Sequence, residues 1–136
     1  MSPDPAAGAV SPVTGFSHVQ LRVHDLAVSL EWYRRALGLE PWVADLTAGY
    51  ATLRHPGTGV VVVLTAGGGA VGADPGAGAL DHLAFAVPDG ASLEAWADHL
   101  TELGMAHPGV VLEDRRPSLQ LRDPDGTAVE LVAPAP

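Results

Sequence analysis

The sequence contains no cysteine and no lysine. The lack of cysteine excludes disulfides, zinc–thiolate sites, iron–sulfur clusters and cysteine nucleophiles, so any metal ion must be bound by His, Asp, Glu and water. All 7 basic residues are arginines, they form no stripe that could follow a phosphate backbone, and the formal net charge is −9. Nucleic acid is therefore not an expected partner.

Long apolar runs are also missing. The sequence has no run of about eighteen apolar residues, which is the length needed to span a membrane. Residues 1–15 also lack the basic and apolar segments of a secretory signal, so a cytoplasmic protein is expected. Residues 1–15 are rich in Pro, Ala and Gly and are predicted to be a flexible leader before a single domain over 16–136. With 47% apolar and 17% charged residues, that domain has ample material for a packed core.

The chain does contain an internal repeat. The segment FSHVQLRV at 16–23 aligns with LDHLAFAV at 80–87 at an offset of 64 residues, which places His18 on His82. Both segments alternate apolar with other residues, as half-buried strands do. In each copy an aspartate suited to cap a helix follows, Asp25 or Asp89, and then an amphipathic stretch that ends in Leu-Gly.

The rest of each copy reads as three extended segments, over 42–44, 49–54 and 60–65 in the first and over 110–112, 118–122 and 127–132 in the second. Each copy is thus predicted to be a βαβββ module. Module 1 spans about 16–65 and module 2 about 80–133, with a Gly-rich linker over 66–79. One helix covers only one face of four strands, so the bare faces are expected to enclose a shared interior. The predicted fold is α+β, a cup-shaped, barrel-like mixed sheet with the helices outside.

Alternation along the strands assigns side chains to the helix side or to the cup. It sends His18 and His82 to equivalent cup positions and Glu130 into the cup from the last strand. An unpaired carboxylate inside a sheet would cost several kcal/mol, so Glu130 needs a partner. Two imidazoles and a carboxylate would bind one divalent ion of Fe, Mn, Ni, Co or Zn and leave positions open. The alternative is a hydrogen-bonded core histidine and a glutamate at a solvated edge.

Three further residues are assigned by the same alternation and by residue type. Tyr50 and Gln120 face the cup and are candidate catalytic residues. Trp42 is interpreted as a cover of the core, although it could instead line the mouth of the cup.

The segments 16–19, 32–39, 80–85 and 122–131 together resemble the vicinal oxygen chelate superfamily, and the similarity extends over 16–133. This group contains glyoxalase I, extradiol dioxygenases, fosfomycin-resistance enzymes, methylmalonyl-CoA epimerase and bleomycin-resistance proteins. The resemblance implies paired βαβββ modules around a metal cup, with ligands on the first and last strand of each module. Three ligands carry over as His18, His82 and Glu130. Val63 stands at the fourth position, which argues against a four-ligand glyoxalase I or epimerase.

The resemblance implies an enzyme that uses one divalent metal ion and acts on a small oxygenated substrate that chelates the metal. Dioxygenase-like or lyase/isomerase chemistry is expected, and Tyr50 and His107 are candidates for the acid and base of a dioxygenase. The alternative is a bleomycin-resistance-like protein that binds a small molecule without catalysis. A homodimer is expected, and whether the modules pair within one chain or across the dimer stays open.

Overall fold

The structure is a computed structural model that describes residues 11–67 and 80–136. The predicted leader and Gly-rich linker fall largely on 1–10 and 68–79, which lie outside the described residues. The first module contains β1 (Val19–Val23), α1 (Leu26–Leu37), β2 (Glu40–Asp45), β3 (Tyr50–Arg54) and β4 (Val61–Ala66). The second contains β5 (His82–Ala86), α2 (Gly90–Glu102), β6 (Val111–Glu113), β7 (Arg116–Arg122) and β8 (Ala128–Val132). The prediction of two βαβββ modules is confirmed.

Both helices begin at the predicted aspartates. The Asp25 carboxylate accepts a hydrogen bond from the backbone N–H of Val28 at 3.1 Å, and Asp89 accepts one from that of Ser92 at 2.8 Å. These bonds satisfy backbone donors that the first turn of a helix leaves without partners. The first helix ends at Gly38, which adopts the left-handed φ of 69° that glycine tolerates best. Over the described ranges, neither helix is long and apolar enough to cross a membrane.

The strands form two four-stranded mixed sheets. The N-terminal sheet has the order β1-β4-β3-β2 and the C-terminal sheet the order β5-β8-β7-β6. In each sheet the first and last strands of the module pair in parallel and the other neighbours are antiparallel. The predicted α+β class is confirmed. The sheets are not joined into a closed barrel, and each could form one wall of a cup.

Each sheet buries one face against its own helix. In the N-terminal sheet Ala51, Leu53, Val62 and Leu64 are fully or almost fully buried. In the C-terminal sheet the same pattern holds for the residues Leu119, Leu121, Val129 and Leu131. The residues between them are half-buried or exposed. The predicted alternation is confirmed, and we call the face away from the helix the open face of each sheet.

Strand register establishes which positions of the two modules are equivalent. Val63 on β4 lies beside Gln20 of β1 and Thr52 of β3. Glu130 on β8 lies in the same way beside Ala84 of β5 and Gln120 of β7. The N-terminal sheet thus has Val63 where the C-terminal sheet has Glu130, as the repeat predicts.

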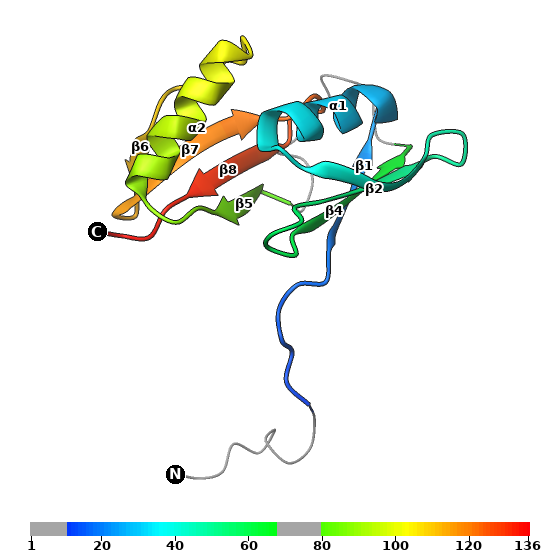
Figure 1. The fold of residues 1–136 in the computed structure, drawn as a ribbon, viewed down its shortest axis with the longest axis horizontal. Coiled ribbons are helices and arrows are strands. Elements are labelled where there is room, and N and C mark those ends of the chain that lie inside the picture. The colour runs from blue at the N-terminus through cyan, green and yellow to red at the C-terminus, as the bar shows by residue number, and fades with distance from the viewer. Residues whose placement is uncertain (1–10, 68–79) are drawn as a thin grey trace.

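The turn between β7 and β8 holds the two modules together. Its Asp123 carboxylate is buried and accepts hydrogen bonds from the Tyr33 hydroxyl of α1 at 2.7 Å and from the backbone N–H groups of Asp125 and Thr127. Asp125 accepts a bond from the backbone N–H of His24 at 2.8 Å. Figure 1 shows the resulting arrangement, in which the modules lie side by side with both helices on the same side. Within residues 11–67 and 80–136, the open faces of the two sheets therefore do not enclose a common interior.

The environment of Tyr33 and Asp123 changes the proton affinity of both groups. Burial, and then the charge of Asp123, raise the pKa of the Tyr33 hydroxyl above its usual range. Burial also raises the pKa of Asp123, and the hydrogen bonds that it accepts oppose that rise. The hydroxyl stays protonated as the donor of this contact.

We predict that Tyr33→Phe lowers the free energy of unfolding by about 1.5–3 kcal/mol, because a hydrogen bond to a buried carboxylate is lost. Urea denaturation followed by circular dichroism measures the change. Tyr50→Phe is the matched control. It removes the hydroxyl of the other tyrosine in the sequence, which lies half-buried on the open face of β3 and not in the contact with Asp123. Equal losses in the two variants would contradict the role assigned to Asp123.

Candidate metal centre

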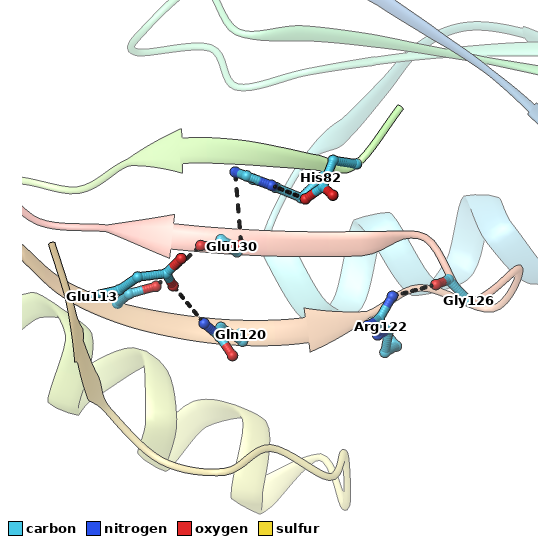
Figure 2. Close-up of polar contacts among 8 residues, drawn as sticks. His82, Glu113, Gln120, Arg122, Gly126 and Glu130 are labelled. Carbon is cyan, nitrogen blue, oxygen red and sulfur yellow. Dashed lines mark hydrogen bonds and ion pairs between the residues drawn. The ribbon is translucent and has the colours of Figure 1, made fainter. Parts of the chain in front are cut away.

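Two of the three predicted ligands face each other on the open face of the C-terminal sheet. The Nε2 atom of His82 on β5 lies 3.8 Å from Oε2 of Glu130 on the neighbouring strand β8. Figure 2 shows the imidazole directed across the sheet toward the carboxylate. Two ligand atoms that share an ion at about 2.1 Å lie roughly 3.0–3.4 Å apart for angles between the right angle and the tetrahedral angle. A small side-chain rotation would therefore let both atoms bind one ion.

The other ring nitrogen of His82 is already held. Nδ1 lies 2.7 Å from the Asp81 carboxylate. A carboxylate at one nitrogen of a histidine orients the ring and leaves the other nitrogen for a metal ion. The pKa of His82 is raised, first by this hydrogen bond and then by the negative charge of Glu130. His82 is thus oriented as a ligand from Nε2.

Glu130 is the least solvated of the predicted ligands. Its side chain is 12% exposed, whereas that of His82 is 41% exposed. Its hydrogen bond from the Ser118 hydroxyl is long, at 3.3 Å, and within 11–67 and 80–136 no arginine forms an ion pair with it. A carboxylate so far removed from water is stabilised by a neighbouring cation, and both a protonated His82 and a metal ion bound beside it would serve as that cation.

His18 is not brought to this pair. It precedes β1 on the N-terminal sheet, is exposed, and its Nδ1 lies 3.0 Å from the Ser17 hydroxyl. In the parts of the chain that the structure describes, no three His, Asp or Glu side chains lie close enough to hold a metal ion. The described residues therefore present a pair of candidate ligands, His82 and Glu130, which we call the half-site, and a separate His18. Alternation could place each residue on a face but could not place the two sheets relative to each other.

The half-site opens onto a hollow of about 440 Å³. Its lining includes Ser118 and Glu113, an acid that no sequence pattern singled out. Figure 2 shows Glu113 of β6 on the same face as Glu130, where its Oε2 accepts a 2.7 Å hydrogen bond from the Gln120 amide. Its position follows from the β6–β7 pairing, which the residues around Glu113 do not indicate by themselves.

The remaining candidates are distributed over both modules. Gln120 is half-buried beside Glu130 on the C-terminal sheet, and Tyr50 is half-buried on the N-terminal sheet. His107 follows α2, where its Nε2 lies 2.8 Å from the Thr101 hydroxyl, and it does not line the hollow. One interpretation is wrong: Trp42 does not cover the core but is 55% exposed. A bulge between Pro41 and Val43 breaks the alternation of β2, and the ring lies against Arg54.

The orientation of His82 by Asp81 leads to a prediction for its titration. In Asp81→Asn the pKa of His82 should fall toward its usual value, because the leading cause of the rise is removed. An NMR titration of the imidazole carbon-bound protons measures it. Asp98→Asn, which removes the same charge from the exposed face of α2, should leave the His82 curve in place. If the two variants behave alike, Asp81 does not hold the ring.

Comparisons with known proteins agree with the fold of two βαβββ modules. The family model described as Glyoxalase/Bleomycin resistance protein/Dioxygenase superfamily matches residues 15–131. A glyoxylase/bleomycin resistance protein/dioxygenase domain from Frankia sp. EAN1pec has a TM-score of 0.76 and 31% identity, covering 90% of this chain and 93% of that one. A comparison with curated sequences finds no match.

Two more distant structures share the fold. Lactoylglutathione lyase from Agrobacterium tumefaciens has a TM-score of 0.72 at 22% identity, covering 90% of this chain and 96% of that one. A mutant of the fosfomycin resistance protein FosX from Listeria monocytogenes, solved with Mn(II) and 1S,2S-dihydroxypropylphosphonic acid, has a TM-score of 0.67 at 16% identity, covering 89% of this chain and 90% of that one. Because the family model covers most of the sequence and the two βαβββ modules are present, the chain belongs to the glyoxalase/bleomycin resistance protein/dioxygenase superfamily.

Proposed function

We propose that this protein is a divalent-metal-dependent enzyme that acts on a small oxygenated substrate able to chelate the metal. His82 and Glu130 would hold the ion together with His18. The observation that carries the proposal is Glu130, a carboxylate with 12% of its side chain exposed, which faces a ring nitrogen and pairs with no arginine of the described residues. The Mn(II) complex of the fosfomycin resistance protein supports it by analogy of fold.

The donor set fits Fe, Mn, Ni, Co or Zn as divalent ions, since two imidazoles and one carboxylate leave positions open for substrate. When bound, such an ion supplies a Lewis acid with about one net positive charge, which favours oxygen atoms that gain negative charge. This suits dioxygenase-like or lyase/isomerase chemistry. Val63 at the position equivalent to Glu130 leaves the N-terminal sheet without a carboxylate there and makes room for the substrate.

The chain's own residues would orient the substrate and move protons. The amide nitrogen of Gln120, on the strand beside Glu130, is held by its 2.7 Å bond to Glu113, and the amide oxygen would be the acceptor for a substrate hydrogen bond. The Tyr50 hydroxyl, on the N-terminal sheet, would be the proton donor once that sheet faces the C-terminal sheet of a second copy. We assign both residues as candidate catalytic groups of the complete cup.

The complete cup requires a second copy of the chain. Within one chain His18 does not join His82 and Glu130, and the two open faces do not face each other. A homodimer in which the N-terminal sheet of one protomer covers the C-terminal sheet of the other would bring the three ligands together twice. Such an isologous pairing buries the same surfaces on both protomers.

A small-molecule binding protein of the bleomycin-resistance kind, without catalysis, is the second candidate. Val63 in place of a fourth ligand and the exposed apolar side chains of Trp42 and Val43 favour it, since they offer an apolar binding wall. Binding of a small molecule that persists when His18, His82 and Glu130 are all changed to Ala would favour this alternative over the enzyme.

Metal analysis tests the proposal directly. The purified protein, dialysed against Mn(II), Ni(II), Co(II) or Zn(II), should retain about one ion per complete cup. His82→Ala should abolish retention without a change in the circular dichroism spectrum. His55→Ala, which removes an exposed imidazole from the turn after β3, should retain the ion. Failure of every divalent ion to bind the wild-type protein would overturn the metal site.

Mixed dimers test whether the ligands come from two chains. His18→Ala and His82→Ala should each lack metal, yet an equal mixture refolded together should recover about one quarter of the wild-type sites, since half of the dimers are mixed and each has one intact site. The matched control is a mixture of His82→Ala with Glu130→Ala. Both changes affect the same half-site, so nothing should be recovered. No recovery in the first mixture would place all three ligands in one chain.

A further inference from the structure

Arg54 and Trp42 form a stacked pair on the open face of the N-terminal sheet. The guanidinium carbon lies 4.5 Å from the centre of the indole ring. Arg54 is exposed, and Trp42 is 55% exposed. The exposed part of the indole ring offers apolar surface that a bound ligand would cover, and that burial would contribute favourably to binding.

Local backbone structure places both side chains on this face. Arg54 alternates with Leu53, which is buried against α1, so the arginine leaves the sheet on the other side. The bulge between Pro41 and Val43 adds one residue to β2 opposite β3, which brings the ring of Trp42 under the guanidinium. Bulges redirect side chains in this way.

The guanidinium lies over the indole ring, and its N–H groups remain available to a ligand. In the described residues the side chain of Arg54 makes no hydrogen bond and no ion pair. Glu40 stands directly opposite on β2, yet it does not pair with Arg54. A guanidinium oriented by an aromatic ring can bind the two oxygens of a carboxylate or related oxyanion at once.

This free cation lies in the same cross-strand row as the candidate ligand His18. Val61 of β4 is the partner of Arg54, and extending the β1–β4 register by one residue places His18 on the other side of Val61. Two strand spacings, roughly 10 Å, then separate the two backbones. The surface between them is apolar, with Val61 and Val63 half-buried.

We propose that Arg54, stacked on Trp42, is a specificity element that binds an oxyanion at the end of the substrate remote from the metal. The substrate class is an organic acid with neighbouring oxygens at one end, a short apolar or planar body, and a carboxylate or similar oxyanion at the other. This inference rests on the proposed function for the role of His18. The geometry of the pair is independent of it.

The first experiment needs no metal. The indole N–H signals of the three tryptophans are followed by NMR in the metal-free protein, with Trp42→Phe identifying the Trp42 signal. Benzoate should shift that signal saturably, with at least about tenfold stronger binding than benzyl alcohol, as one charge-assisted pair allows. Arg54→Met should abolish the preference. Arg22→Met, which removes an exposed arginine from the edge strand β1 of the same open face, should not.

The second experiment joins the two ends of the substrate. Calorimetry with the Zn(II)-loaded protein compares catechol with 3,4-dihydroxybenzoate. The two probes have the same pair of chelating oxygens, and only 3,4-dihydroxybenzoate also carries a carboxylate. The wild type should prefer the acid about tenfold or more, and Arg54→Met should bring the ratio to about one. A preference for the acid that survives in Arg54→Met, or a loss of equal size in Arg22→Met, overturns the proposal. If Zn(II) does not increase the affinity for catechol, that result contradicts the metal site but not the role of Arg54. The benzoate titration then decides the role of Arg54.

Discussion

The buried carboxylate of Asp123 fixes how the two halves of this protein meet. It belongs to the second module but accepts its shortest side-chain hydrogen bond, 2.7 Å, from Tyr33 of the first. Its neighbour Asp125 binds the backbone just before α1. The most extensive contacts between described elements lie within each module. These polar contacts, together with the 2.9 Å hydrogen bond between His99 of α2 and the Arg35 carbonyl of α1, therefore contribute to the angle between the modules. Such a polar contact favours one relative placement of the modules, because a buried carboxylate without hydrogen-bond partners lowers the stability of the fold.

These contacts have a consequence for the site. With the helices on one side, no described element covers the two open faces (Figure 1). The candidate half-site of His82 and Glu130 has its local contacts in place, with Asp81 at Nδ1 of the ring and the Ser118 hydroxyl on the carboxylate. Among the described residues, no second sheet faces it. Strand pairing within the second module determines the contacts of His82 and Glu130. The placement of the two modules determines whether His18 joins them, so the first can be in place without the second.

Much of the fold could be predicted from the sequence because it is encoded locally. Alternation determined the buried faces, Asp25 and Asp89 marked the helix starts, and the repeat assigned Val63 as the counterpart of Glu130, as the strand register confirms. The exposure of Trp42 could not be predicted, since a single added residue reverses the side of a strand. The placement of His18 relative to His82 was equally out of reach, because it depends on contacts made by a turn about a hundred residues away along the chain, at Asp123 and Asp125.

The difference between Val63 and Glu130 has a further meaning when the two open faces are compared as electrostatic surfaces. The C-terminal face presents Glu113 and Glu130 together with Arg122. The N-terminal face presents Arg22 on β1 and Arg54 on β3, with valines of β4 between them and Glu40 opposite Arg54. Two C-terminal faces placed together would bring the Glu130 carboxylates of both copies toward each other, whereas the N-terminal face has the uncharged Val63 at that position. The two halves of the repeat are therefore not interchangeable as surfaces, because one has a carboxylate where the other has an apolar side chain.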